Sequence, residues 1–381
     1  MSIYLDHAAT TPVHPEVLDA MLPYYSNNYG NASSTHNFGR AARAAIHSGR
    51  DQMAELLGCR PNELTFTSGG TESDNTAIIG IAETLREKGR HIITTAIEHH
   101  AVLHTCGFLE RFGYDVTYLP VDEHGRIRLD DLERAIRPDT ILISVMYANN
   151  EIGTIQPIVE IGELARSKGI LFHTDAVQAL GHLNLRLNDL PVDLAAFSAH
   201  KIHGPKGIGA LYVAGHVQVA PLLHGGNQER KRRPGTENVA GIAGFAKALQ
   251  ISIKNMYEMQ QNLEKLRQVM VDGLFSELNS GFVVNGDAAN RVPHILNVSF
   301  PGVSTETMLM NLDLEGIAAA SGSACTSGSL EVSHVLKAMR LPEDVVSSAV
   351  RFSFGRDNNE FQVQEAVHKI ATIVRRIRNT K

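Results

Sequence analysis

The stretch Ser198-Ala-His-Lys-Ile-His-Gly-Pro-Lys-Gly-Ile-Gly209 lies between two apolar runs, Leu194-Ala-Ala-Phe197 and Ala210-Leu-Tyr-Val213. This pattern predicts two buried strands joined by a Gly- and Pro-rich turn, with Lys201 just after the first strand. A lysine at the end of a buried strand is costly unless its charge is used or neutralised. We therefore interpret Lys201 either as an amine that forms a Schiff base with an aldehyde cofactor or as a solvated turn lysine. The second interpretation is favoured for Lys206.

Outward from this stretch, short apolar runs alternate with helical patterns. Besides the two runs above, strands are expected at residues 64–66, 91–95, 116–119, 140–146 and 170–174. Helices are expected at residues 14–22, 37–57, 75–85, 101–112, 129–136 and 159–168. Strands that alternate with helices predict a mainly parallel sheet covered on both faces. Ligands of such sheets bind at the carboxyl ends of the strands.

The C-terminal third has a different pattern. Residues 239–278 are helical, and the long charged part from Tyr257 to Leu274 is expected to bridge to a second domain. Further strands are expected at 294–300 and 351–354, and further helices at 305–312 and 360–378. This segment predicts a small α+β domain.

Composition excludes several classes of protein. The 381 residues carry a net charge of −6 and a pI near 6.3, which argues against a general surface for nucleic acid or anionic membranes. The N-terminus lacks a signal-peptide pattern, and no apolar run is long enough to span a bilayer. Three scattered cysteines form neither a disulfide framework nor a CxxC metal motif, and HExxH is absent. A cytoplasmic protein without an intrinsic metal is expected.

Polar groups follow several of the expected strands. Thr67-Ser-Gly-Gly-Thr71 joins a strand to a helix and offers backbone N–H groups for a phosphate, although such turns are usually structural. Asp175 could pair with a protonated pyridine nitrogen or cap a helix. The amides at 149–150 could orient a cofactor oxygen or bond backbone. His99 could stack on a cofactor ring and move protons, or be a structural histidine.

Cys325 lies in Ser321-Gly-Ser-Ala-Cys-Thr-Ser-Gly-Ser329, where every other residue is Ser, Gly, Ala or Thr. A segment so poor in large side chains cannot anchor itself in a core, so we expect it to be mobile. A structural cysteine is normally buried and inert, which favours a nucleophilic thiol for Cys325. Burial is favoured for Cys59 and Cys106, which lie in or beside apolar patterns.

Two further groups are suited to anions. The basic loop at 225–238 could be a solvated face, or could bring the hydroxyl of Thr236 to a phosphate. Arg351, in an apolar strand of the second domain, is suited to bidentate binding of a carboxylate.

Together these stretches resemble the NifS/IscS-like cysteine desulfurases, pyridoxal-phosphate enzymes of the class V aminotransferase superfamily. The matching runs cover almost the whole chain in the family's order: LDHAATTP, TSGGTESDN, EHHAVL, ANNEIGTIQPI, FHTDAVQALG, SAHKIHGPKG, RPGTENVAGI, SGSACTSGS and RFSFG. The resemblance implies an α/β protein of the type I pyridoxal-phosphate transferase fold. Residues 12–256 would form the large seven-stranded domain, and residues 1–11 and 257–381 the small domain with the cysteine loop.

The resemblance also implies a role for each site residue. Lys201 would carry the cofactor as a Schiff base, His99 would stack on its ring and assist proton transfer, and Cys325 would form the persulfide. Cofactor contacts would come from Gly70, Thr71, Asn150, Asp175, Gln178, Ser198, His200 and, across a homodimer interface, Thr236. Substrate L-cysteine would be bound by Arg351, aided by Asn31. Alanine would be released, and sulfur would pass to an iron–sulfur scaffold or a tRNA-thiolation enzyme.

Some features stay open. Ala32 and Val332 stand where proline is frequent in the family, which concerns loop stiffness and removes no chemical group. Cys325 is also a candidate for transient ligation of a cluster during transfer. An aminotransferase or a selenocysteine lyase would share the lysine, the aspartate and the phosphate site without needing Cys325. A non-catalytic sulfur carrier or assembly partner that kept the fold would not need Lys201 or the cofactor.

Overall fold

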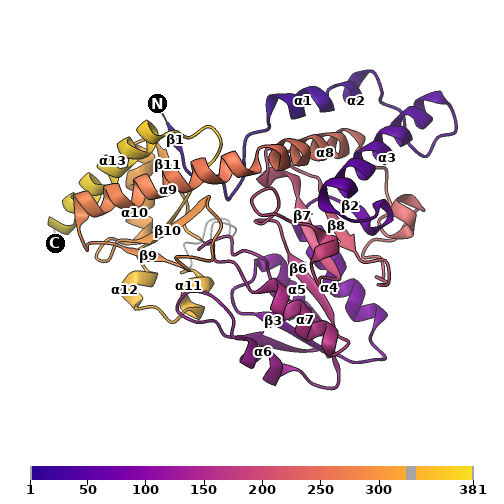
Figure 1. Ribbon diagram of the computed structural model, residues 1–381, viewed down its shortest axis with the longest axis horizontal. Coiled ribbons are helices and arrows are strands. Elements are labelled where there is room, and N and C mark those ends of the chain that lie inside the picture. The colour runs from indigo at the N-terminus through magenta and orange to yellow at the C-terminus, as the bar shows by residue number, and fades with distance from the viewer. Residues whose placement is uncertain (1, 323–331, 380–381) are drawn as a thin grey trace.

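The structure, a computed structural model, describes residues 2–322 and 332–379 (Figure 1). Within these residues the larger sheet has seven strands in the order β2-β8-β7-β6-β5-β3-β4. The strands are β2 (Leu64–Thr67), β3 (His91–Thr95), β4 (Asp115–Leu119), β5 (Thr140–Ser144), β6 (Leu171–Asp175), β7 (Leu194–Ser198) and β8 (Gly209–Val213). Neighbouring strands are parallel except where β8 pairs with β2 and with β7. The expected mainly parallel seven-stranded sheet is confirmed.

The central strands are buried on both faces because their sequences are almost continuously apolar. Every residue of β5 and of β7 is buried. The connection from β7 to β8 reverses the chain, so the segment around Lys201 lies at the carboxyl end of β7. The sheet topology therefore fixes where the lysine lies before any side-chain contact is considered.

The helices beside this sheet pack against one core of buried apolar residues, to which α2 adds only the partly buried Tyr24. They are α1 (Pro15–Met21), α2 (Pro23–Ser26), α3 (Asn37–Leu57), α4 (Gly70–Thr84), α5 (His100–Glu110), α6 (Leu129–Ala135), α7 (Ile158–Ser167) and α8 (Val239–Lys254). Helix α1 begins at Pro15, where a missing N–H costs nothing, and the side chain of His14 caps it. Helix α4 begins at Gly70, five residues before the expected start at residue 75.

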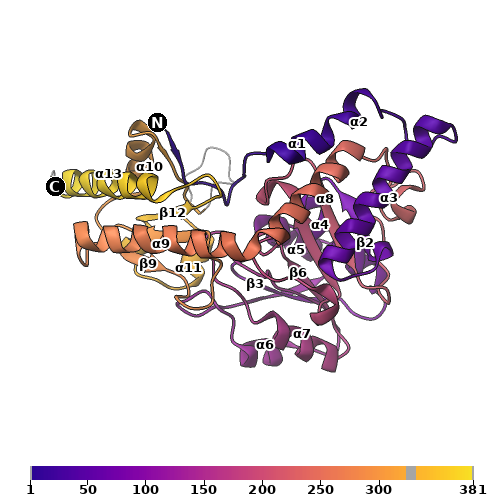
Figure 2. The ribbon, with the colours of Figure 1, turned by 45° about the horizontal axis from the view of Figure 1, so that its top comes forward.

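The rest of the chain builds a smaller unit (Figure 2). Its antiparallel sheet has the order β12-β10-β9, and β1 pairs with β11 in parallel beside it. These strands are β1 (Ile3–Tyr4), β9 (Val283–Asn285), β10 (Ile295–Ser299), β11 (Ile317–Ala318) and β12 (Ala349–Ser353). The helices are α9 (Met256–Leu278), α10 (Thr305–Leu314), α11 (His334–Ala338), α12 (Glu343–Val346) and α13 (Glu360–Asn379). Figures 1 and 2 both show α9 and α13 side by side.

Two large clusters of buried apolar residues underlie this arrangement. One surrounds the seven-stranded sheet, and the other joins the smaller sheet to α9, α10 and α13. Val335 and Leu336 of α11 pack with the first cluster, although the predicted division assigns them to the small domain. The boundaries at residues 12 and 256 stay a prediction.

The N-terminal arm runs from the smaller sheet toward the larger one. Ser353 in β12 donates its N–H to Leu5 O at 2.7 Å, and its Oγ accepts from the N–H of Ala8 at 2.8 Å. The arm is thereby fixed where the two units meet. Across residues 2–322 and 332–379, no helix combines the length and apolar character that crossing a membrane requires.

Candidate active site

Several strands of the large sheet end at one cavity of about 930 Å³. As expected for a mainly parallel sheet, the cavity lies at the carboxyl ends of these strands. Among its lining residues are ten of the predicted site residues: Gly70, Thr71, His99, Asn150, Asp175, Gln178, Ser198, His200, Lys201 and Arg351. Residues from distant parts of the sequence are thus brought to one place.

Lys201 ends a short 3-10 turn that follows β7 directly. Its Nζ donates to the carbonyl oxygens of Ala8 and Ala9, both at 2.7 Å. The N-terminal arm therefore holds the amine at the cavity. A lysine half-buried against two backbone carbonyls is not simply solvated, which favours the first interpretation, and the role of Lys201 as a Schiff-base amine stays a prediction.

Asp175 ends β6, and its Oδ1 accepts from the N–H of Val177 at 2.9 Å. Burial raises the pKa of Asp175 to about 6, opposed by the Val177 hydrogen bond and the charge of Lys201. The side chain is thus a carboxylate at neutral pH. It is suited to pair with a protonated ring nitrogen.

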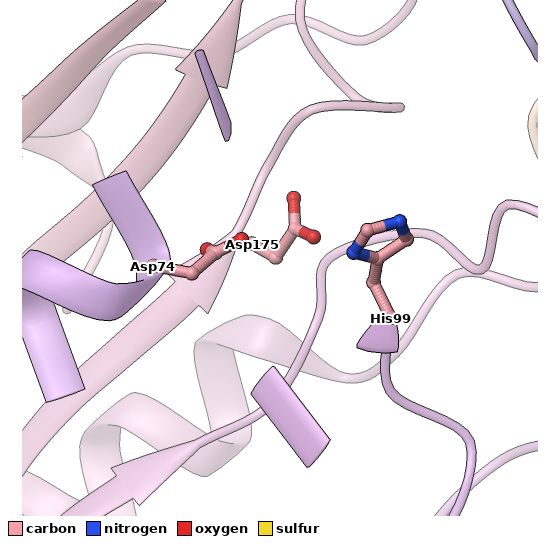
Figure 3. A group of neighbouring side chains, drawn as sticks. All are labelled: Asp74, His99 and Asp175. Atoms are coloured by element: carbon pink, nitrogen blue, oxygen red, sulfur yellow. The ribbon is translucent and has the colours of Figure 1, made fainter. Parts of the chain in front are cut away.

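Asp74 lies behind Asp175 and was not predicted. Ligand-type atoms of Asp74, His99 and Asp175 lie within 4.8 Å of one another (Figure 3). Burial raises the pKa of Asp74 well above its ordinary value, and the charges of Asp175 and Glu98 raise it further. Two adjacent buried carboxyl groups do not both ionise, so Asp74 keeps its proton and Asp175 carries the charge.

His99 caps the N-terminus of α5, where its Nδ1 accepts from the N–H of Ala101 at 3.1 Å. Burial and the charge of Lys201 lower the pKa of His99 to about 4. The imidazole is therefore neutral near pH 7, and its proton is on Nε2 because Nδ1 is an acceptor. Figure 3 shows the ring facing the carboxyl group of Asp175.

Gly70 and Thr71 form the first turn of α4, whose N–H groups are not used within the helix. A Cβ on Gly70 would lie 2.8 Å from Val177 Cγ2, so a larger residue there would push against the Val177 side chain. The hydroxyl-bearing Ser198 and the ring of His200 line the same cavity. Together these groups form an anion site at a helix N-terminus.

Gln178 also lines the cavity, between two fixed partners. Its Nε2 donates to Ala8 O at 3.0 Å, and its Oε1 lies 3.0 Å from His294 Nε2. Burial lowers the pKa of His294, so the ring is neutral and donates through Nε2–H. The second N–H of Gln178 stays available to an acceptor in the cavity.

Arg351 lies in β12 and is almost fully buried. Its two terminal nitrogens donate to Asn150 O and to Asp6 Oδ1, each at 2.9 Å. Its Nε is buried with no partner among the described residues. A guanidinium held in this way presents a fixed positive charge to an anionic group in the cavity.

Three predicted residues do not line this cavity. Thr236 lines a separate cavity of about 150 Å³, together with Ser68 and Gly235 of the same chain. Asn31 lies in a loop where its Oδ1 accepts from the N–H of Ser33. Cys325 lies outside the described residues, which reach Gly322 on one side and Val332 on the other. The roles of all three stay predictions.

Asp74 and His173 were not predicted as site residues, although their spacing from predicted residues would have indicated them. Asp74 is four residues after Gly70, which places it one turn further along the same helix face. His173 precedes Asp175 by two positions on β6, so both side chains face the same side of the sheet. His173 Nδ1 lies 2.8 Å from Ser144 Oγ, and its Nε2 lies 3.5 Å from Asp74 Oδ1.

The arrangement fits one kind of ligand. It offers an anion site at a helix N-terminus, a buried carboxylate for a cationic ring nitrogen, and an amine for an aldehyde. It also offers an arginine for a second anion. Each of these groups has a counterpart in pyridoxal phosphate bound together with an amino acid.

Comparisons with known proteins agree with this chemistry. Residues 3–365 match the model of the family described as aminotransferase class-V. The chain is 50% identical over 378 residues to the cysteine desulfurase IscS of Methanosarcina thermophila, covering 99% of this chain and 93% of that protein. It is also 50% identical to the putative cysteine desulfurase IscS 1 of Bacillus subtilis, covering 98% and 99% of the two chains.

Solved structures give the same result. A NifS-like protein superposes with a TM-score of 0.93 at 40% identity, covering 98% of this chain and 100% of that one. The structure described as SspA in complex with cysteine superposes with a TM-score of 0.83 at 37% identity, covering 93% and 99%.

The chain therefore belongs to the class V aminotransferase family. Within this family it is a cysteine desulfurase, and its cofactor is pyridoxal phosphate. The α/β fold expected from the resemblance is confirmed as well.

Proposed function

We propose that this protein transfers the sulfur of L-cysteine to Cys325 as a persulfide, releases L-alanine, and then passes the sulfur to an acceptor. One observation carries the proposal. Lys201, Asp175, His99 and Arg351 line a single cavity, whose described wall reaches Gly322, three residues before Cys325 in the sequence.

The cofactor would be held at three places. Its phosphate would bind at the N-terminus of α4, its ring nitrogen at Asp175, and its aldehyde carbon at Lys201. The remaining proposed contacts are from Asn150, Gln178, Ser198, His200 and Thr236 of the other subunit. When bound, pyridoxal phosphate supplies an electron-poor ring that takes up the electron pair left at the substrate Cα.

Arg351 would bind the carboxylate of L-cysteine through charge-assisted hydrogen bonds, and Asn31 would assist it. The support is that Arg351 lines the cavity and that its two terminal nitrogens are held by Asn150 O and Asp6 Oδ1. A carboxylate held there keeps the reacting part of the substrate inside the cavity, near Lys201.

Lys201 would remove the proton from the substrate Cα with its neutral amine. The carbonyls of Ala8 and Ala9 direct its Nζ to one side of the cavity. His99, neutral and protonated on Nε2, could donate that proton to the departing product and recover one from the substrate thiol. Asp175 would meanwhile remain a carboxylate and keep the ring nitrogen protonated.

Cys325 would act as the nucleophile through its thiolate. Its sulfur attacks the substrate sulfur, so an S–S bond forms as the C–S bond breaks. The electron pair of that bond passes to the substrate carbon, which takes up one proton to become the methyl group of alanine. Carbon is reduced by the two electrons that the sulfur pair loses, and no outside oxidant is needed.

The reaction products distinguish the proposed desulfurase from an aminotransferase and from a selenocysteine lyase. Incubation of the holoenzyme with L-cysteine should give alanine and protein-bound sulfur in equal amounts, with no keto acid. Formation of a keto acid would indicate an aminotransferase. Alanine formation from selenocysteine but not from cysteine would indicate a selenocysteine lyase.

We further propose a homodimer that works in the cytoplasm, where thiols stay reduced. Cys59 and Cys106 are free thiols in the structure, in keeping with such a setting. An iron–sulfur scaffold or a tRNA-thiolation enzyme would accept the sulfur. Transfer of labelled sulfur from the persulfidated protein to each purified acceptor would distinguish them, and transfer to neither would overturn this part of the proposal.

A further inference from the structure

The two described ends of the cysteine-bearing segment meet at one buried side chain, Glu151. The Oε2 of Glu151 accepts from the hydroxyl of Ser333 at 2.5 Å. On the other side of the segment, a Cβ built on Gly322 would lie only 1.8 Å from the same Oε2. Gly322 and Ser333 therefore both lie against a single carboxyl oxygen.

Both ends are also joined to the substrate cavity. Ala320 exchanges backbone hydrogen bonds with Arg351, at 2.7 and 3.2 Å, and Gly322 lines the cavity itself. On the other side, Ser333 caps α11 by accepting from the N–H of Leu336 at 3.2 Å. His334 Nε2 lies 3.0 Å from Glu98 O, next to His99.

Glu151 is itself held firmly. Asn149 Oδ1 accepts from the N–H groups of Glu151 and Ile152 at 2.8 and 3.0 Å, and Glu151 O accepts from Asn297 at 3.2 Å. The residue is almost fully buried, and burial raises the pKa of its carboxyl group. A buried carboxyl group is costly, so a residue that only filled space here would be apolar.

We propose that Glu151 is a positioning residue for sulfur transfer, because its carboxyl oxygen accepts from Ser333 and lies against Gly322, the described residues on either side of the cysteine segment. Cys325 is three residues after Gly322 in the sequence. This inference rests on the proposed role of Cys325 as the sulfur acceptor.

The test compares four variants as holoenzymes: Glu151→Ala, Glu151→Gln, Ser333→Ala and the control Ser304→Ala. Ser304 is also a helix N-cap, since its Oγ accepts from the N–H of Thr307 in α10 at 3.3 Å and lies 2.8 Å from Thr307 Oγ1. The control therefore removes a comparable cap without touching Glu151. The readouts are the single-turnover rate of persulfide formation, the KM for cysteine, the cofactor absorbance, and amide exchange in peptides covering 318–322 and 332–338.

Glu151→Ala and Ser333→Ala should slow persulfide formation roughly 10- to 100-fold, since a nucleophile misplaced by about 1 Å costs that much. The KM and the cofactor absorbance should stay unchanged, and amide exchange at both ends should become faster. Glu151→Gln should keep most of the rate, because its amide oxygen still accepts from Ser333. Ser304→Ala should match the wild type. Should Glu151→Ala fail to fold, Ser333→Ala carries the test.

Wild-type persulfide rates in both Glu151→Ala and Ser333→Ala would overturn the inference. An equal loss in Ser304→Ala would also overturn it, because the effect would then come from the loss of a helix cap. A wild-type protein that forms no persulfide on Cys325 would instead overturn the proposed function, so the two failures are distinguishable.

Discussion

At the scale of single residues, the surroundings of Asp175 determine whether its side chain is charged. Burial raises its pKa to about 6, while Val177 and Lys201 favour the charged form. A protonated Asp175 cannot pair with a protonated ring nitrogen. The strength of cofactor binding is therefore tied to the ionisation of this one side chain.

Asp175→Asn should weaken binding of pyridoxal phosphate to the apoprotein roughly 10- to 100-fold at pH 8, the worth of a charged hydrogen bond. The ratio of the variant and wild-type dissociation constants should shrink as the pH falls below about 6, because wild-type Asp175 then loses its charge. Equilibrium titrations of both apoproteins with pyridoxal phosphate from pH 5 to pH 8 would measure this ratio. The cofactor phosphate titrates in both proteins and largely cancels in the ratio. A ratio that stays constant over this range would contradict the assignment.

Residue-level prediction from sequence depended on position relative to strands. Lys201, Asp175 and His99 could be predicted because each follows an apolar run, and such strand ends converge in a parallel sheet. Glu151 and His294 could not be predicted as functional neighbours. Their contacts with Ser333 and Gln178 join residues far apart in sequence, and no spacing encodes them.

At the scale of elements, Glu98 ties the ends of two neighbouring strands together. Its Oε1 accepts from Thr95 Oγ, at the end of β3, at 2.7 Å and from the N–H of Met146, just after β5, at 3.0 Å. Burial raises the pKa of Glu98 from 4.5 to about 8. The folded state thus keeps this proton between about pH 4.5 and 8, where the unfolded chain loses it, and stability falls as pH rises across that window.

Glu98→Gln should remove this dependence, because its amide oxygen keeps both hydrogen bonds and does not titrate. At pH 8 the variant should unfold at a higher urea concentration than the wild type, with a free energy of unfolding higher by up to about 4 kcal/mol. At pH 5 the two proteins should unfold at nearly the same urea concentration. Urea unfolding at both pH values with saturating cofactor measures the difference. Equal destabilisation of the variant at both pH values would show that Glu98 is needed as a carboxylate.

Element prediction failed mainly at short elements and at one helix start. The strands β1, β9 and β11 and the helices α2, α11 and α12 have five residues or fewer, too short for a periodic pattern. Helix α4 begins at Gly70 rather than at residue 75, so its first turn contains a glycine packed close to Val177. Glycine has low helix propensity, so the sequence there indicates a turn.

At the scale of the whole molecule, the large and the small sheet both supply residues to the cavity. The N-terminal arm supplies the carbonyls that hold Lys201, and β12 of the smaller sheet supplies Arg351. The fold class could be predicted from alternating strands and helices. The path of the N-terminal arm from the small sheet to the large one could not be predicted, since its first residues form only a two-residue strand.

The proposed dimer makes a prediction about mixed subunits. If Thr236 serves the cavity of the other subunit, Thr236→Ala homodimers should bind the cofactor weakly, and Lys201→Ala homodimers should be inactive. A heterodimer of the two variants would contain one intact site, with Lys201 from one chain and Thr236 from the other. Cofactor titration of purified heterodimers should find one site of wild-type affinity. If the titration finds only weak sites, Thr236 serves the cavity of its own chain.

The central claim is that sulfur from L-cysteine is transferred to Cys325, and peptide mass spectrometry after a single turnover tests it most directly. With labelled L-cysteine, one sulfur atom should be found on the peptide that contains Cys325 and none on those with Cys59 or Cys106, which are thiols with a raised pKa. Cys325→Ala should keep the cofactor and form no alanine in catalytic amounts. Labelled sulfur on another cysteine, or wild-type alanine formation in Cys325→Ala, would contradict the account.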